Sequence, residues 1–436
     1  MADFEISARM RDDWNARARE DAGYYVAFGR RDQNDAEFFE TGVKTAQGIE
    51  WELRRVPREH WGQGRALEVG CGPGRLVRHL SRHFAEIHGV DVSDEMIALA
   101  QRKLAGIPNA RFHIGDGASL RMFTDDCFDF VYSYAVFQHI PSRDVVFEYL
   151  REMRRVMKPG ALAWLQFNGL PRASQEHYNT WAGARFTSSD LVEFTAAYDF
   201  QVLALEGVAT QYMWSIWRKQ PQGWRAALED RAAEAHLRIR RITNANSSEP
   251  VAPSRGRFAS ISLWVENLPP EASLHHLRVT VGDSFGTVTY IGAPDSAGLQ
   301  QVNVLLPELD ATGLLPVEVQ WLGQRISPPA TLRVIPPGPS VPHLASLTDG
   351  VNLVAGARIE TRSVKLTLEE IGRPYEIEAS VGGKPVGDLE YFCIDPRPQK
   401  YEVNFPLPEG VAPGRHSLEI RMGRRKLAPV TLDVIA

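Results

Sequence analysis

Cysteine is scarce in this sequence, which has only Cys71, Cys127 and Cys393 among 436 residues and no CxxC pair. Such an odd and sparse set supports neither a disulfide framework nor a thiolate zinc site. It is typical of a reduced compartment, so we expect a cytoplasmic protein. Long apolar runs are also missing: none approaches the roughly 20 residues that cross a bilayer. The first residues, MADFEISARMRDD, lack the apolar core of a secretory signal.

An excess of one charge is lacking too. Lysine and arginine number 49 and aspartate and glutamate 54, for a formal net charge of −5. This balance gives no global electrostatic footprint for nucleic acid. The sequence has no carboxylate cluster and no CxxC pair, so we expect no metal site. What remains is a small-molecule enzyme or a binding protein.

The chain is long enough for two to four domains. Residues 1–64 read as a helical amino-terminal cap. Between 65 and 219, apolar strand-like runs alternate with amphipathic helical runs, which predicts an α/β domain with a doubly wound parallel sheet. The expected strands are Arg65–Val69, Glu86–Val92, Arg111–Gly115, Phe128–Tyr134 and Ala161–Phe167, with two edge strands at Phe200–Leu205 and Tyr212–Trp217.

Residues 220–249 are rich in alanine and arginine, and we interpret them as a helical linker. From about 250 onward, short strand-like runs are separated by proline and glycine, which predicts all-β domains. This region repeats itself at an offset of 100 or 101 residues: VTVGD at 279–283 matches ASVGG at 379–383, and TLRVI at 331–335 matches TLDVI at 431–435. We therefore expect two β-sandwiches, at 250–338 and 339–436.

One stretch, ALEVGCGPGRL at 66–76, places three glycines behind the first expected strand. Gly70, Gly72 and Gly74 predict a tight strand-to-helix turn that a ligand approaches closely. The dinucleotide pattern GxGxxG would need a small residue at Arg75, so the spacing is GxGxG instead. The phosphate-binding pattern GxxxxGK[ST] is absent as well. The loop is therefore of a nucleotide-binding type, but of neither of these two.

The stretch resembles the first motif of the class I S-adenosylmethionine-dependent methyltransferases. Three further motifs follow in order: HGVDVS at 88–93, IGDG at 114–117 and FDFVYSYAVFQHIP at 128–141. The resemblance covers about residues 60–219 and implies a Rossmann-like domain that binds S-adenosyl-L-methionine. The two carboxy-terminal repeats resemble immunoglobulin-like modules of the IPT/TIG type in their strand pattern alone, which implies no function.

The resemblance implies a set of cofactor-binding residues. Asp91 would accept hydrogen bonds from both ribose hydroxyls, because a carboxylate offers several lone pairs on a short side chain. Val92 and Met96 would flank the adenine, and Asp116 with Gly117 would bond its edge. The full expected set is Glu68, Gly70, Gly72, Gly74, Asp91, Val92, Met96, Asp116, Gly117, Ser133 and Tyr25.

The expected catalytic residue is His139, which follows the fourth strand near the methyl group. It is either a base or a histidine that stabilises the loop by bonding backbone. Tyr24 and Tyr25 belong to a lid or to ordinary helix packing. Two interpretations remain for each of four aromatic residues, which either line an acceptor pocket or pack in the core: Tyr178, Trp181, Tyr212 and Trp214. We interpret Cys71 as a small buried residue.

The sequence thus predicts a methyltransferase for a small-molecule or a glycan- or lipid-linked acceptor, with no nucleic-acid partner and no membrane span. The sandwiches would hold a homodimer, a protein partner or a large substrate. One alternative is a non-catalytic scaffold that binds the methyl donor, and another is an NAD-dependent oxidoreductase. We also expect that a chain ending near residue 242 folds alone.

Overall fold

The computed structural model describes residues 2–27, 31–56, 61–170, 178–228, 235–351, 356–395 and 399–435. The chain divides into two compact units. The first unit comprises residues 1–27, 31–254 and 259–335, and the second unit residues 28–30, 255–258 and 336–436. Among the described residues, no helix has the length and apolar content that a membrane span requires.

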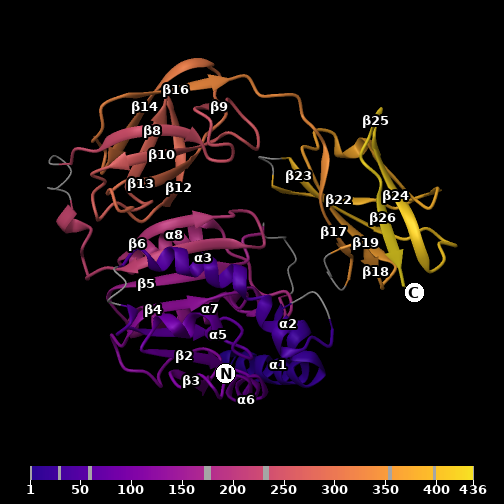
Figure 1. The fold of residues 1–436 in the computed structure, drawn as a ribbon, viewed down its shortest axis with the longest axis horizontal. Coiled ribbons are helices and arrows are strands. Elements are labelled where there is room, and N and C mark those ends of the chain that lie inside the picture. The colour runs from indigo at the N-terminus through magenta and orange to yellow at the C-terminus, as the bar shows by residue number, and fades with distance from the viewer. Residues whose placement is uncertain are drawn as a thin grey trace. The chain divides into compact units, whose positions relative to one another are not determined.

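The first half of the first unit is a doubly wound sheet in the strand order β3-β2-β1-β4-β5-β7-β6 (Figure 1). The first five strands are parallel, whereas β7 pairs antiparallel with both β5 and β6. The strands are β1 (Arg65–Val69), β2 (Glu86–Asp91), β3 (Ala110–Ile114), β4 (Phe128–Ser133), β5 (Met157–Phe167), β6 (Phe200–Glu206) and β7 (Met213–Lys219).

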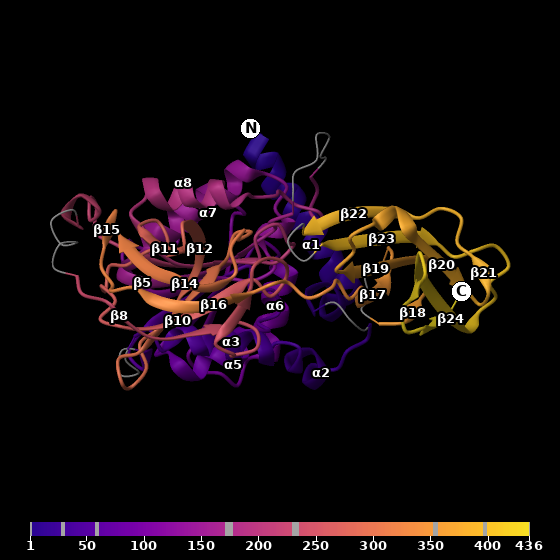
Figure 2. The ribbon, with the colours of Figure 1, turned by 90° about the horizontal axis from the view of Figure 1, so that it is seen from above.

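Helices cover both faces of this sheet, with α7 and α8 on one face and α3 and α5 on the other (Figure 2). The helices are α1 (Ala2–Ala27), α2 (Asp35–Glu40), α3 (Val43–Leu53), α5 (Val77–Leu80), α6 (Asp94–Lys103), α7 (Arg143–Val156) and α8 (Ser188–Ala197), with short 3-10 turns η1 (Ser81–His83) and η2 (Phe137–His139). Three of these helices begin as their sequences indicate, because the side chains of Ser93, Ser142 and Thr187 cap the first turns.

The helix expected after the glycine loop is shorter than its sequence indicates. The stretch RLVRHLSRHF forms α5, which has four residues, and then the 3-10 turn η1. The Asn109 amide donates to the carbonyl oxygens of Ser81 and Phe84 at 2.8 and 2.9 Å. These bonds end the helix where the chain must turn into β2.

The second half of the first unit is all-β. Its strands are β8 (Arg238–Asn244), β9 (Val251–Pro253), β10 (Ser260–Glu266), β11 (Leu277–Val281), β12 (Ser284–Ile291), β13 (Gln300–Leu305), β14 (Gly313–Trp321), β15 (Gln324–Arg325) and β16 (Ala330–Ile335). The helical linker expected over 220–249 is wrong at its end, because β8 lies there and pairs with β10. Alanine and arginine favour a helix locally, but pairing with β10 buries the end of this segment as a strand.

The second unit has a four-stranded and a six-stranded sheet around one core. Its elements are β17 (His343–Asp349), β18 (Arg358–Ile359), β19 (Ser363–Glu369), η4 (Pro374–Glu376), β20 (Ile377–Val381), β21 (Lys384–Pro385), β22 (Glu390–Asp395), β23 (Lys400–Pro406), β24 (Gly414–Met422), β25 (Arg425–Lys426) and β26 (Val430–Val434).

The strand pairings repeat along the chain. The order β8-β10-β13-β12 recurs as β17-β19-β23-β22, and the order β9-β16-β14-β11 recurs as β18-β26-β24-β20. In both copies a short second strand, β9 or β18, pairs in parallel with the last strand, β16 or β26. The first copy therefore begins at β8, before the expected boundary at 250.

Candidate functional site

The glycine loop leaves β1 through three residues with positive φ: Gly70 at 75°, Gly72 at 49° and Gly74 at 82°. Two of these positions exclude a side chain through protein packing. A Cβ atom on Gly70 would lie 2.2 Å from Val136, and one on Gly74 would lie 2.5 Å from Leu104. On Gly72 it would meet only Val26, at 3.4 Å. Close ligand approach, expected at all three glycines, is thus not needed to explain Gly70 and Gly74.

Asp91 joins the end of β2 to this loop. Its Oδ2 accepts from the Gly72 amide at 2.9 Å and its Oδ1 from the Ser93 amide at 2.9 Å. Burial raises the pKa of the Asp91 carboxyl, although both amides oppose that shift. Each carboxylate oxygen has a further lone pair, so two more donors fit on this group.

Helix α1 lies across the ends of β2 and β3. Arg11 donates to the Val92 carbonyl at 3.1 Å and to the Gly115 carbonyl at 2.9 Å. The Ser93 hydroxyl, which caps α6, donates to the side-chain oxygen of Asn15 at 2.6 Å. The cofactor candidate Met96 follows in the first turn of α6 and is buried, while Val92 is half-buried.

Asp116, at the end of β3, bonds its own turn. Its Oδ1 accepts from the Ala118 amide at 2.9 Å and the Ser119 amide at 2.6 Å. Burial opposes ionisation, but these bonds and one from the Ser119 hydroxyl lower the pKa of Asp116 overall. Gly117 has φ 91°, and a Cβ atom there would lie 2.9 Å from Ser7 of α1.

Two expected site residues, Ser133 and Glu68, form hydrogen bonds inside the sheet, and Cys71 is buried in the loop that follows. The buried Ser133 hydroxyl donates to the Val69 carbonyl at 2.9 Å, which ties β4 to β1. The Glu68 carboxyl accepts from the Tyr132 hydroxyl at 3.0 Å, and burial raises its pKa to about 8. The Cys71 thiol is 2% exposed, as expected of a small buried residue.

His139 closes the turn after β4. Its Nδ1 lies 2.8 Å from the Trp181 carbonyl oxygen. Since a carbonyl only accepts, Nδ1 holds the proton and Nε2 has a lone pair. Burial lowers the pKa of His139 to about 4, so the ring is neutral at pH 7. The backbone bond fits the loop-stabilising interpretation, and the lone pair of Nε2 accepts from the Gln138 amide nitrogen at 3.2 Å.

The backbone of the turn that follows β4 is strained at one residue. Ala135 has φ 56°, a left-handed conformation that costs a non-glycine residue on the order of 1 kcal/mol. Its amide donates at 2.9 Å to Oε1 of Gln166, whose amide nitrogen donates at 3.1 Å to Oε1 of Gln138. The turn that presents His139 is thus held by two buried glutamines.

An aromatic cluster joins α1 to His139. The rings of Trp14 and Trp181 both have centroids 5.4 Å from that of His139, and Tyr25 packs on Trp181 at 5.9 Å. The Arg17 guanidinium lies 4.7 Å from the Trp14 ring and 5.3 Å from the Trp181 ring. Tyr25 and Trp181 thus lie near the expected catalytic residue.

The other aromatic candidates lie elsewhere. Tyr24 is buried beside Tyr25, and the half-buried Tyr178 packs against the core cluster to which α7 and α8 contribute. Trp214 stacks on Tyr134 at 5.4 Å, on the sheet face of α3 and α5. Tyr212 is 46% exposed.

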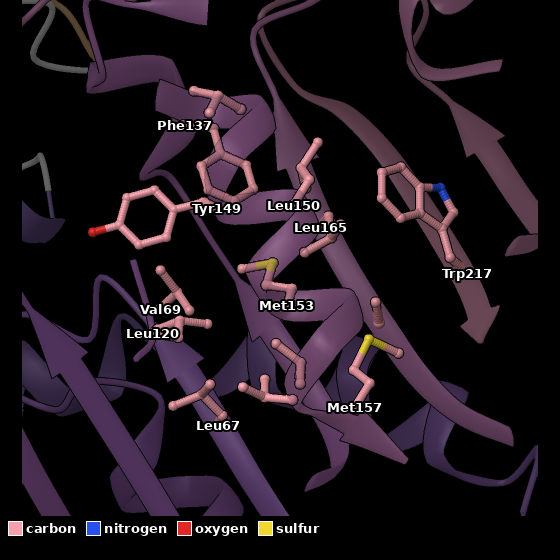
Figure 3. Packing of buried hydrophobic residues seen from close by; sticks show 14 of the residues in the cluster. Leu67, Val69, Leu120, Phe137, Tyr149, Leu150, Met153, Met157, Leu165 and Trp217 are labelled. Carbon is pink, nitrogen blue, oxygen red and sulfur yellow. The ribbon is translucent and has the colours of Figure 1, made fainter. Parts of the chain in front are cut away.

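Sequence reasoning missed Arg11 and Asn15, which hold α1 in place, and Tyr149 of α7. Tyr149 is buried with its hydroxyl turned away from the apolar side chains around it (Figure 3). Its spacing with Val145, Val146 and Met153 is that of a core face, so the pattern alone gives no sign of a polar role. Among the described residues, no group of three or more His, Cys, Asp or Glu side chains is placed to hold a metal ion.

Comparison with known proteins bears on the same segment. Phosphoethanolamine N-methyltransferase 2 of Caenorhabditis elegans is 29% identical over 123 residues, 27% of this chain and 27% of that protein. A demethylmenaquinone methyltransferase of Staphylococcus aureus is 34% identical over 101 residues, 22% of this chain and 40% of that protein. The chain thus spans about a quarter to two fifths of the length of these curated relatives.

A solved complex of Haemonchus contortus phosphoethanolamine N-methyltransferase 1 covers 51% of each chain at 17% identity. Its TM-score of 0.37 is too low to add to the argument. The sequence model of a methyltransferase domain family matches residues 66–160, from β1 to the middle of β5. Residues 66–160 therefore match a methyltransferase domain, a finding that supports S-adenosylmethionine as the cofactor.

Proposed function

We propose that the protein transfers a methyl group from S-adenosylmethionine to a small-molecule or a glycan- or lipid-linked acceptor. The observation that supports this most directly is the position of Asp91, bonded to the Gly72 amide at the end of β2 and covered by α1. Its free lone pairs fit two ribose hydroxyls. The donor-binding residues that we propose are Glu68, Gly70, Gly72, Gly74, Asp91, Val92, Met96, Asp116, Gly117, Ser133 and Tyr25.

The protein's part in this chemistry is mainly positioning. When bound, the donor supplies a methyl group on a sulfonium, which is already a good leaving group. The chain has to align the acceptor with that methyl group and exclude water, which is the role we assign to α1 and the turn after β4.

His139 fits an orienting role in this proposal. A general base works best with a pKa near the working pH, and the pKa of His139 is lowered to about 4. Its unprotonated Nε2 accepts from the Gln138 amide in this structure, so a hydroxyl or amine of the acceptor would take the place of that amide as donor. Of the two interpretations of His139, we therefore favour an orienting acceptor over a proton-removing base.

The acceptor is best sought in two chemical classes. One relative is named for a phosphorylated amino alcohol and another for a quinone. We propose the two β regions as immunoglobulin-like sandwiches outside the chemistry, available for a partner or for a large acceptor. Both acceptor classes should therefore be assayed with the full chain.

Calorimetric titration with S-adenosylmethionine, S-adenosylhomocysteine and NAD tests the donor assignment. We expect the two sulfur nucleosides to bind and NAD not to bind. Asp91→Ala should weaken donor binding at least tenfold, because it removes hydrogen bonds to a charged group worth about 1.5–3 kcal/mol each. The matched control is Asp125→Ala, an exposed carboxylate paired with Arg155.

Unchanged donor affinity in Asp91→Ala would overturn the site assignment, and preference for NAD would indicate an oxidoreductase. Formation of S-adenosylhomocysteine with either acceptor class is the activity readout. Tight donor binding with no product from any acceptor would instead support the non-catalytic scaffold.

A further inference from the structure

We propose that Tyr149 is an additional donor-binding residue, whose hydroxyl donates a hydrogen bond to a lone pair of the nucleoside. The inference rests on the proposed function and adds a contact from α7, an element that none of the quoted sequence motifs includes. It concerns binding of the nucleoside part rather than methyl transfer itself.

The position of the ring is the first support. Tyr149 is 5% exposed and belongs to the core cluster that includes Val69 at the end of β1, Val90 in β2 and Leu120 after β3. The carboxyl ends of these strands form the edge where open α/β sheets bind ligands. In Figure 3 the Tyr149 ring lies near Val69 and Leu120, and its hydroxyl points away from Leu150 and Met153.

The hydroxyl itself is the second support. The side chain of Tyr149 is nearly buried, but its hydroxyl oxygen is not one of the fully buried polar atoms that lack a partner, so it reaches the protein surface. Within the described part of the chain, no protein group forms a hydrogen bond with the Tyr149 hydroxyl. An unpaired donor on a nearly buried side chain is a feature that a bound molecule would complete.

The electrostatic surroundings are the third support. Burial raises the pKa of Tyr149, and the carboxylates of Asp116 and Asp91 raise it further. The hydroxyl therefore stays protonated, and it lies within electrostatic reach of both residues proposed to hold the nucleoside. Neither carboxylate accepts a hydrogen bond from the Tyr149 hydroxyl. Asp91 accepts from amides of the glycine loop and of Ser93, and Asp116 accepts from amides of its own turn. The hydroxyl is thus free to donate to a purine nitrogen or a ribose oxygen.

Tyr149→Phe is the direct test, because it removes one oxygen and keeps the ring. We expect S-adenosylhomocysteine and adenosine to bind about 3–10-fold more weakly in calorimetric titration, the usual effect of one neutral hydrogen bond. The melting temperature of the ligand-free protein should stay within about 1 °C, since no protein bond is lost. The control is Tyr198→Phe, a hydroxyl that accepts from Arg151 at the surface.

Unchanged affinity of Tyr149→Phe for both ligands would overturn the inference while leaving the proposed function intact. A loss for S-adenosylhomocysteine without one for adenosine would overturn the nucleoside assignment. Failure of the wild-type chain to bind either sulfur nucleoside would instead remove the proposed function on which the inference rests.

Discussion

At the residue scale, Glu68 is a buried acid whose pKa lies well above its usual value. The carboxyl is 3% exposed, and burial outweighs the bond from Tyr132 and the charge of Arg75, so its pKa rises to about 8. The folded state thus holds a proton that the unfolded chain releases above its ordinary pKa of about 4.3. Stability contributed by this group is present at low pH and is lost as the pH rises through 8.

Glu68→Gln should remove this loss of stability at high pH, because glutamine does not ionise. We expect the variant to gain melting temperature relative to the wild type as the pH rises from 5 to 8.5, since each pKa unit is worth about 1.4 kcal/mol. Calorimetric scans of the ligand-free protein across this range measure the difference. A constant gap between the two proteins at all pH values would show that Glu68 is ionised in the fold.

Spacing made much of the candidate site predictable, but only where a motif fixes the backbone. The glycines, Asp91 and Asp116 follow strands whose apolar runs are plain in the sequence. Arg11 and Tyr149 escaped prediction because their partners are distant in sequence: Arg11 donates to the Val92 carbonyl, 81 residues away. Such contacts depend on tertiary packing, which a periodic pattern does not encode.

At the element scale, α1 is held over the proposed donor site by hydrogen bonds from several of its side chains, among them Arg11 and Asn15. Arg11 binds the carbonyls at the ends of β2 and β3, whereas Arg9, two residues earlier, makes only a 3.9 Å exposed ion pair with Asp13 among its described contacts. The helix also breaks at Asp21, where φ is −167° and the side chain accepts from the Tyr24 amide at 2.9 Å. The segment before this break is thus a separate cover over the strand ends.

Arg11→Ala should loosen this cover. We expect faster hydrogen exchange across residues 5–20 and a donor dissociation rate about 3–10-fold higher, because two hydrogen bonds to carbonyls are lost. Stopped-flow displacement of the donor measures the rate, and Arg9→Ala is the matched control. Equal rates in the two variants would mean that α1 does not retain the donor.

Strands were predicted better than the connections between them. The runs for β1 and β5 are apolar and bounded by breakers, so local sequence and tertiary burial agree. The end of the segment 220–249 was assigned wrongly because its composition favours a helix, while β8 gains its stability from pairing with β10 and from burying Ile242; residues 229–234 of the expected linker lie outside the described residues. The strand pairing reveals what the 100-residue repeat did not, since β8 occupies the place that β17 holds in the second copy, although the two strands are not separated by 100 or 101 residues.

At the scale of the whole molecule, the first β region is joined to the methyltransferase sheet by bonds of several kinds. Strand β12 pairs with β6 at Tyr290 and Ala204. The Tyr290 hydroxyl donates to Glu52 at 3.0 Å, and Arg55, in a buried ion pair with Glu52, also donates to the Ile291 carbonyl at 2.5 Å. Removing the first β region would expose the Glu52–Arg55 ion pair to water and would remove its hydrogen bonds to Tyr290 and Ile291.

These contacts between the first β region and the methyltransferase sheet change the expectation that a chain ending near residue 242 folds alone. A chain ending at Ile335, the end of the first compact unit, should keep the melting temperature of that unit. A chain ending at Ile242 would expose the apolar face around Val202, whose amide and carbonyl both bond Ser273, and would leave Gln201 without the carbonyls of Pro270 and Ala272. We expect it to melt at least 10 °C lower or to aggregate, because several buried polar groups lose their partners together. Scanning calorimetry of the two chains measures this difference. Equal melting temperatures would restore the view, taken from the sequence alone, that the methyltransferase half is an independent domain and that the first β region is an appendage.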